Sequence, residues 1–309
     1  MTTLRIATRG SALALWQANY VRDLLRGQDP ELAIDLLALK TTGDRIVDRP
    51  LTEMGGKGLF VKEIEEALLD GRADLAVHSM KDLPTALADG LVIVAVPIRA
   101  DSSDALCLPH GKKVNSLDEV PQGARLGTSS LRRFCQLKQA RPDLRFDSLR
   151  GNVDTRLKKL DEGQYDAIVL AAAGLDRLGL ADRIALRLPA SLMLPAVAQG
   201  ALAIECRARD AENCKRVAPL DHGETRLSVD AERAFLARLE GGCQTPIAGY
   251  ASIETGSGVL TLRGLVGSPD GSATVLGSRS GIAASGPAIG KALAEDLLAR
   301  GAERFLRPG

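Results

Sequence analysis

The chain has few of the residues that mark several common classes of protein. It contains only three histidines, so we do not expect a histidine-rich metal centre. Its five cysteines are scattered without paired CxxC spacing, which argues against a disulfide framework or a zinc site and favours a reducing cytoplasm. No stretch approaches the roughly 20 consecutive apolar residues that span a bilayer. The net charge of +1 gives no support for bulk attraction to nucleic acid or to a membrane surface.

The remaining composition is that of an ordinary soluble protein. Charged residues make up 26% and hydrophobic residues 45% of the 309 residues, a length that predicts two or three domains. No low-complexity tract or short repeat is evident. The chain enters a strand at Leu4 without the apolar core of a signal peptide, so we expect a cytoplasmic protein.

Strand and helix patterns alternate through the first part of the chain. Apolar runs predict the strands, and hydroxyl residues mark helix starts, with Ser11 before one helix and Thr128-Ser129-Ser130 before another. This alternation indicates an α/β fold with parallel strands. The predicted strands are residues 4–8, 34–39, 75–77, 91–96, 125–127, 144–148 and 167–171, and the predicted helices are residues 12–26, 60–68, 131–139 and 153–160.

Three segments depart from this alternation. Residues 41–58 are rich in Gly, Asp, Pro and charge, which predicts a long loop that is either a functional lid or a disordered tip. Residues 198–206 resemble a crossing segment. From Leu220 onward, a helix, short strands with glycine turns and a closing helix at residues 288–298 indicate a separate small α+β domain.

Arginine recurs at three junctions where a strand gives way to a helix. The junctions are Arg9-Gly10-Ser11, residues 128–133 and residues 150–156. A helix N-terminus attracts carboxylates and phosphates, and an arginine adds two parallel hydrogen bonds to a carboxylate. Surface arginines with local acidic partners explain any one junction well but three less well, because a cation opposes the dipole in the first turn. We interpret the junctions as a polyanion site in the cleft between two α/β domains.

The segment His78-Ser79-Met80-Lys81-Asp82 directly follows a predicted strand, where α/β proteins meet their ligands. Adjacent charges such as Lys81 and Asp82 more often form a solvated pair in a turn. The functional interpretation is that Asp82 faces the arginine-lined cleft, holds a cationic or N–H-bearing substrate and transfers protons. We interpret His78 as a hydrogen-bonded structural histidine rather than a catalyst.

The segment Glu240-Gly241-Gly242-Cys243-Gln244-Thr245-Pro246 follows a helical pattern. Its two glycines end the helix in a sharp turn and its proline prevents the helix from resuming. A cysteine on such a turn can protrude for covalent chemistry. Taken alone, the segment is better explained by Cys243 as a small buried hydrophobic residue. The rest of the chain reverses that preference.

These residues resemble the porphobilinogen deaminase family, also called hydroxymethylbilane synthase, of tetrapyrrole biosynthesis. The resemblance extends in the family's order over nearly the whole chain, and the segment around Cys243 is its most specific part. The matching segments are residues 4–11 with Leu15-Trp16-Gln17, 55–63, 78–82, 127–133, 149–153, 198–201 and 232–246.

The resemblance implies a transferase that carries a dipyrromethane cofactor on Cys243 through a thioether. Four porphobilinogen molecules would be added in turn with release of ammonia, and hydrolysis would then release hydroxymethylbilane for haem biosynthesis. Asp82 would be the catalytic acid. Each added ring brings an acetate and a propionate, which agrees with the polyanion site. The implied cofactor-binding residues are Lys81, Asp82, Thr128, Ser129, Ser130, Arg132 and Arg133; the implied substrate-binding residues are Arg9, Ser11, Arg150, Arg156 and Arg177; the implied lid residues are Lys57 and Phe60; no metal is implied.

The resemblance also implies an α/β fold with two type II periplasmic-binding-protein-like domains around a cleft and a small C-terminal α+β domain. The first domain would be residues 1–98 with 199–216, the second residues 99–198, and the third residues 217–309. The expected state is a monomer that binds porphobilinogen and hands its product over transiently to uroporphyrinogen-III synthase. Neither nucleic acid nor a membrane is an expected partner.

Two other classes of protein stay open at this point. A two-domain anion-binding module without catalysis, of the solute-receptor or regulator type, is compatible with the fold, but Asp82 beside the arginines and Cys243 on its turn favour an enzyme. A hydrolase with a cysteine nucleophile needs a partner histidine. The three histidines, His78, His110 and His222, offer little support for it.

Overall fold

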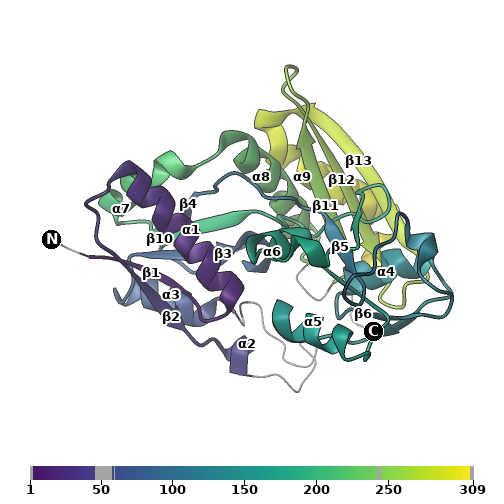
Figure 1. Ribbon diagram of the computed structural model, residues 1–309. Coiled ribbons are helices and arrows are strands. Elements are labelled where there is room, and N and C mark those ends of the chain that lie inside the picture. The colour runs from purple at the N-terminus through teal and green to yellow at the C-terminus, as the bar shows by residue number, and fades with distance from the viewer. Residues whose placement is uncertain (1–2, 46–57, 59, 242–244, 307–309) are drawn as a thin grey trace. The chain divides into compact units, whose positions relative to one another are not determined.

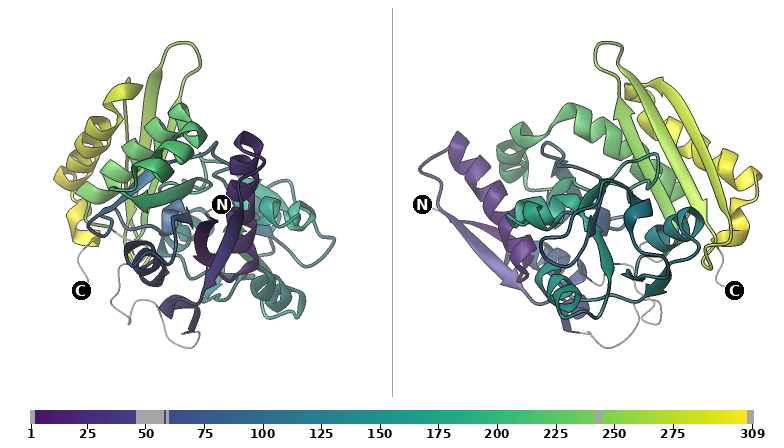
Figure 2. Two further views of the ribbon diagram at one scale, coloured as in Figure 1. Left: turned by 90° about the vertical axis from the view of Figure 1, so that its left-hand side faces the viewer. Right: turned by 45° about the vertical axis from the view of Figure 1, so that its right-hand side comes forward.

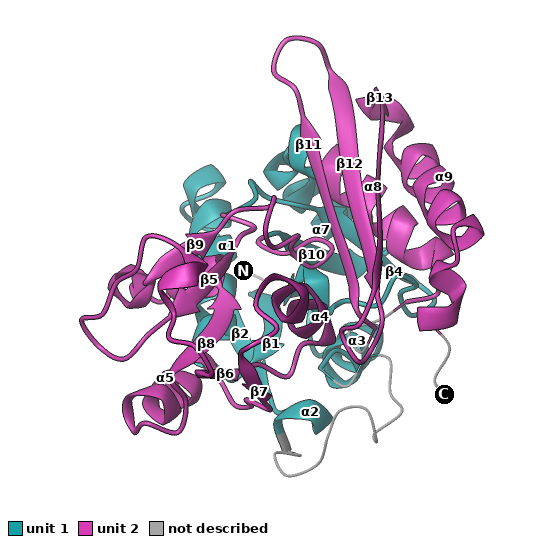
Figure 3. Ribbon diagram, turned by 90° about the vertical axis from the view of Figure 1, so that its right-hand side faces the viewer, with its two compact units in different colours: residues 1–100, 201–226 teal, residues 101–200, 227–309 magenta. Residues whose placement is uncertain are grey.

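The computed structural model describes residues 3–45, 58, 60–241 and 245–306. The chain forms two compact units, residues 1–100 with 201–226 (unit 1) and residues 101–200 with 227–309 (unit 2) (Figures 1 and 3). Unit 1 is therefore discontinuous in sequence. The predicted boundaries of three domains stay a prediction.

Unit 1 is built on a mixed five-stranded sheet in the order β2-β1-β3-β10-β4. β1 pairs in parallel with β2 and β3, as the strand–helix alternation predicts. β10 pairs antiparallel with both β3 and β4, so the predicted crossing segment contains an inserted strand. The strands are β1 (Leu4–Arg9), β2 (Ile34–Leu39), β3 (Leu75–Ser79), β4 (Leu91–Ala95) and β10 (Leu202–Arg207).

Helix α1 illustrates how the sequence forms the elements of unit 1. The Ser11 hydroxyl accepts a hydrogen bond from the Ala14 amide and caps the helix, as predicted. Val21 and Leu25 of α1 are buried against Ile6 and Leu75 of the sheet. The predicted loop at residues 41–58 differs from the structure in its first part, because α2 occupies Thr42–Arg45. The helices are α1 (Ala12–Gln28), α2 (Thr42–Arg45), α3 (Lys62–Leu69), η2 (Met80–Asp82), α7 (Ala211–Val217) and η5 (Ala218–Leu220).

The sheet of unit 2 repeats the pattern of the first, in the order β7-β6-β8-β5-β9. β6 pairs in parallel with β7 and β8, whereas β5 is antiparallel to β8 and β9. The strands are β5 (Asp104–Cys107), β6 (Arg125–Gly127), β7 (Arg145–Asp147), β8 (Ala167–Ala171) and β9 (Leu186–Leu188). The helices of this part are η3 (Leu117–Glu119), α4 (Leu131–Ala140), α5 (Val153–Asp161), α6 (Ala172–Arg177) and η4 (Ala181–Arg183).

The C-terminal part of unit 2 has its own antiparallel sheet in the order β11-β12-β13, with α9 along one face (Figure 2). Phe235 of α8 is fully buried, and its ring contacts the backbone at Gly264 of β12. The predicted α/β fold with a small C-terminal α+β region is confirmed. The elements are α8 (Gly223–Arg238), β11 (Ile247–Ile253), β12 (Val259–Gly267), β13 (Thr274–Ile282), η6 (Ala283–Ser285), α9 (Gly286–Ala299) and η7 (Ala302–Phe305).

Candidate active site

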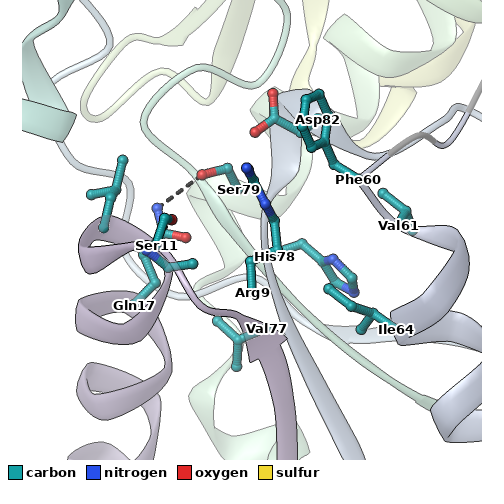
Figure 4. A pocket seen from close by; sticks show the side chains of 12 residues that line it. Arg9, Ser11, Gln17, Phe60, Val61, Ile64, Val77, His78, Ser79 and Asp82 are labelled. Atoms are coloured by element: carbon teal, nitrogen blue, oxygen red, sulfur yellow. Dashed lines mark hydrogen bonds between the residues drawn. The ribbon is translucent and has the colours of Figure 1, made fainter. Parts of the chain in front are cut away.

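Unit 1 contains a small pocket of about 60 Å³ where strand ends meet helix starts (Figure 4). Three residues predicted from the sequence to act on substrate, Arg9, Ser11 and Asp82, line it together with Phe60. The other lining residues are Leu13, Ala14, Gln17, Val61, Ile64, Val77, His78 and Ser79.

The pocket follows from the order of the strands. β1 and β3 are neighbouring parallel strands, so their carboxyl ends lie at the same edge of the sheet. Arg9 is the last residue of β1, and Asp82 lies in the η2 turn directly after β3. Residues that are far apart in sequence are thereby brought to one ligand-accessible edge.

The turn that carries Asp82 is held by neighbouring backbone and side chains. The Met80 amide donates a hydrogen bond to the Ala201 carbonyl at 3.0 Å. Gln17, which is 3% exposed, donates from Nε2 to the Ser79 hydroxyl at 2.8 Å (Figure 4). Asp82 itself is half-buried. Its carboxylate is therefore presented from a fixed turn to a partly dehydrated pocket, which strengthens its electrostatic effect.

Arg9 lies beside the carboxylate of Asp44 in α2. Its Nη2 donates to Asp44 Oδ1, and its Nε lies 3.3 Å from Asp44 Oδ2. The guanidinium carbon also lies 4.3 Å from the centre of the Phe60 ring. The predicted anion-binding arginine thus already holds a carboxylate of the chain itself.

His78 forms a buried polar pair beneath the pocket. Its Nε2 lies 3.0 Å from Oε2 of Glu205, which is fully buried in β10. The other oxygen of Glu205 is buried without a hydrogen-bond partner among the described residues. Burial, with the charge of Glu205 adding to it, raises the pKa of nearby Glu65. The pairing agrees with the interpretation of His78 as a hydrogen-bonded structural residue.

In unit 2, Arg132 and Arg133 share one carboxylate. Asp104 is fully buried and receives hydrogen bonds from Arg132 Nη1 at 2.6 Å and Arg133 Nε at 2.9 Å. Burial opposes the charge on Asp104, but the two guanidiniums outweigh burial and hold the pKa of Asp104 well below its usual value. Gln199 also donates to Asp104, at 3.1 Å. Two cations against one anion leave the cluster with net positive charge.

The three hydroxyl residues before this arginine pair lie at the start of α4, where the sequence predicts a helix cap. Ser130 caps α4 by accepting from the Arg133 amide, and the buried Thr128 accepts from the Ser130 amide at 3.2 Å. The exposed Ser129 donates to the Leu149 carbonyl at 2.9 Å. The helix start is therefore well ordered by its own hydrogen bonds.

The remaining predicted arginines also lie in unit 2. Arg156 donates from Nε to the Gly151 carbonyl at 2.7 Å, and Arg177 donates to the Gly200 carbonyl at 2.7 Å. Arg150 is half-buried and precedes α5, whose N-cap Asn152 makes no side-chain capping bond. Their roles as ligands for substrate carboxylates stay predictions.

Lys81 lies in the η2 turn of unit 1, half-buried beside Asp82. The predicted lid residue Lys57 and the predicted cofactor residue Cys243 lie outside the described residues.

Sequence reasoning did not identify several residues of these sites. Each of these residues contacts a predicted or pocket-lining residue that is far away in sequence. The pairs are Asp44 with Arg9, Asp104 with Arg132, and Glu205 with His78. For Asp104 and Glu205, a charged residue within a buried strand was a usable signal, because such residues are almost always paired.

Within the part of the chain that the structure describes, no helix is both long and apolar enough to cross a membrane. The described residues also contain no group of three or more His, Cys, Asp or Glu side chains suited to a metal ion.

Solved structures that resemble part of this chain include binding domains of low sequence identity. The periplasmic VFT2 domain of BvgS from Bordetella pertussis is 14% identical, with 71% of this chain and 86% of that chain covered and a TM-score of 0.41. The aliphatic sulphonate-binding protein SsuA from Escherichia coli is 17% identical, with 77% and 70% covered and a TM-score of 0.40. With TM-scores below 0.5, these likenesses carry no argument.

Family models give a specific result. Residues 4–215 match the model of the dipyrromethane cofactor binding domain of porphobilinogen deaminase, and residues 226–299 match the model of its C-terminal domain. The two matches include the pocket with Arg9 and Asp82 and the arginine pair of unit 2. They support a transferase and do not favour a binding module without catalysis. The chain belongs to the porphobilinogen deaminase family.

Proposed function

We propose that the protein joins four porphobilinogen molecules head to tail, with loss of ammonia at each step, and then releases hydroxymethylbilane by hydrolysis. The observation that carries this proposal is the family match over both parts of the chain. The pocket supports it, because Asp82 and Arg9 line the same cavity, and binding and protonation of porphobilinogen would require a carboxyl group and a cation close together. The protein would work as a monomer in the cytoplasm and pass its product to uroporphyrinogen-III synthase.

The side chains at the start of α4 fit a cofactor that bears carboxylates. Two buried guanidiniums share the single carboxylate of Asp104, so the cluster has one positive charge left for an anionic group. The hydroxyls of Thr128 and Ser130 accept hydrogen bonds from backbone amides and can donate to such a group, and Ser129 is proposed beside them. Together with Lys81, these residues would hold the dipyrromethane, which when bound supplies the pyrrole end to which porphobilinogen is joined.

Covalent attachment is proposed at Cys243. Three of the four cysteines in the described part of the chain, Cys107, Cys135 and Cys206, are buried. Burial raises the pKa of Cys107 to about 12 and of Cys135 to about 11. Such thiols are poor nucleophiles at neutral pH, because the thiolate is the reactive form. These burials support Cys243 as the site of a thioether.

Asp82 is the residue of the pocket suited to the chemistry itself. Departure of ammonia from porphobilinogen requires a proton at the amino group and leaves positive charge on the pyrrole. A carboxylic acid that donates this proton becomes a carboxylate that stabilises the cation, and in a partly dehydrated pocket that effect is large. Arg9 and Ser11 would bind and orient the substrate carboxylates there.

Further carboxylates have to be bound as the product lengthens. Arg150, Arg156 and Arg177 are proposed for this task, since each guanidinium can bind a carboxylate through two parallel hydrogen bonds. Phe60 and Lys57 are proposed as lid residues. Phe60 lines the pocket beside Arg9, which supports its part in excluding water.

The mass of the intact purified protein tests the proposal. We expect it to exceed the sequence mass by two linked pyrrole rings, and peptide mapping should place the addition on Cys243. The addition should survive denaturation with thiols, because a thioether is not cleaved by thiol exchange. Porphobilinogen should add a ladder of one-ring increments.

Cys243→Ser should lose the addition and the activity. Cys214→Ser is the matched control, because Cys214 is the half-buried cysteine of the described residues, with its sulfur 3.6 Å from the Arg207 carbonyl oxygen. This variant should keep both. Active protein with the bare sequence mass would refute the proposal.

A further inference from the structure

The guanidinium of Arg9 is engaged in the way that an arginine binds a ligand carboxylate. Nη2 and Nε face the two different oxygens of Asp44, and this side-by-side geometry is the bidentate one. The two side chains are 22% and 23% exposed, so water and ligands reach the pair. Arg9 also lines the pocket that contains Asp82.

Asp44 is held in place independently of Arg9. The Thr41 amide and hydroxyl donate to Asp44 Oδ2 at 3.2 Å and 2.8 Å. The next residue, Thr42, donates from its amide to Glu63 Oε1 in α3 at 2.7 Å. Burial opposes the charge on Asp44, but hydrogen bonds from Arg9 and Thr41 outweigh it and lower the pKa of Asp44. The carboxylate is therefore charged and fixed at neutral pH.

Phe60 packs against the same two elements. Its ring lies 4.3 Å from the Arg9 guanidinium carbon, and a Cβ atom added at Gly43 would lie 2.2 Å from ring atom Cε1. Position 43 thus leaves no room for a side chain while the ring stays in place. The segment with Asp44 is seated closely against the pocket.

We propose that Asp44 is an internal competitor for Arg9, whose carboxylate takes the place that an acetate or propionate group of porphobilinogen takes when substrate binds. This inference rests on the proposed function, because it takes Arg9 as a substrate-binding residue. Substrate binding then has to break the ion pair between Arg9 and Asp44, and the free energy needed for this lowers the affinity for substrate. When a substrate carboxylate leaves Arg9, Asp44 can replace it, so Arg9 is not left unpaired. This suits a reaction in which new substrate carboxylates bind in every cycle.

Asp44→Asn tests the competition, since the amide keeps the shape of the side chain but loses its charge. A partly exposed ion pair contributes up to about 1 kcal/mol, which corresponds to about a fivefold change in affinity. We expect the KM for porphobilinogen to fall about fivefold. Acetate, used as a pyrrole-free carboxylate at constant ionic strength, should inhibit the variant at correspondingly lower concentration. An unchanged or raised KM would overturn the inference and make Asp44 a residue that orients Arg9.

Two further variants separate the contact from general charge effects. Asp70→Asn removes the same charge from an exposed pair with Arg72 in unit 1 and should leave the KM unchanged. In an Arg9→Lys background, Asp44→Asn should lower the KM much less, because an ammonium does not form the bidentate pair. A full decrease in that background would mean that Asp44 does not act through Arg9.

The wild-type protein separates failure of this inference from failure of the proposed function. If the wild type shows no pyrrole adduct and consumes no porphobilinogen, the proposed function is wrong whatever the variants do. If the wild type is active and Asp44→Asn does not lower the KM, only the internal competition is wrong.

Discussion

The Asp104 carboxylate lies 2.6 Å from Arg132 Nη1, and both groups are almost fully shielded from solvent. The same carboxylate also serves Arg133, while Leu194 and Val169 supply carbonyl acceptors to the two guanidiniums. Buried charges are stable only when they are paired and hydrogen-bonded. Burial of Arg132 and Arg133 at the start of α4 therefore depends on the carboxylate of Asp104.

Asp104→Asn should therefore lower the free energy of unfolding by roughly 3–5 kcal/mol, because it leaves two buried cations without a counter-charge. Chemical denaturation of wild type and variant measures this. Asp101→Asn is the control, since Asp101 pairs with Arg187 at a largely exposed site and should contribute about 1 kcal/mol or less. Similar losses in the two variants would contradict the assignment.

Asp104 also predicts how stability depends on pH. Its pKa in the folded protein is lowered, so its contribution is present above the unfolded pKa of about 3.9 and is lost as pH falls through the folded pKa. The wild type should lose stability below about pH 4 more steeply than Asp104→Asn does. If the unfolding free energies of the two proteins fall equally steeply below pH 4, other carboxylates are responsible for the acid sensitivity.

Asp82→Asn should nearly abolish turnover of porphobilinogen while the unfolding temperature stays close to that of the wild type. Loss of proton transfer and of the negative charge commonly reduces rates by ~10²–10⁴-fold. Asp82→Glu keeps the carboxylate and should retain more activity. Near-normal turnover in the Asn variant would remove Asp82 from the catalytic role.

Gly290→Ala should destabilise the C-terminal part of unit 2. A Cβ atom there would lie 2.2 Å from the Ala231 carbonyl oxygen, which is backbone of α8 and cannot rotate away. Overpacking of this kind costs roughly 1–3 kcal/mol. Gly27→Ala is the matched control in α1, where nothing lies within 4 Å, and it should be neutral or stabilising by up to about 1 kcal/mol. Equal shifts in unfolding temperature would refute the packing argument.

Much of the fold could be predicted from the sequence, because periodicity and caps are local signals. Ser11 and Ser130 cap the helices that they were expected to cap, and the strand at residues 167–171 was predicted with its observed bounds. The strand β5, which begins at the charged Asp104, was not predicted. The antiparallel direction of β10 is set by its neighbours in the sheet, which local sequence does not reveal.

The candidate site was predictable to the extent that it depends on single residues. Asp82 was expected to face an arginine-lined cleft, and the structure places it with Arg9 and Ser11 in one pocket. Their partners were not predicted, because Asp44 is 35 residues from Arg9 and no local pattern pairs them. Long-range contacts of this kind depend on topology rather than on propensity.

The insertion of β10 between β3 and β4 has a consequence for the order in which the protein is made. Both flanking strands belong to the first hundred residues, but the strand that joins them begins at Leu202. On the ribosome, β3 and β4 are completed long before β10 emerges, so each keeps an unpaired edge while the whole second sheet is synthesised. During that interval His78 also lacks Glu205, its hydrogen-bond partner in the folded protein. The first hundred residues of unit 1 are therefore synthesised before any of unit 2, yet the sheet of unit 1 can close only after the intervening hundred residues have left the ribosome.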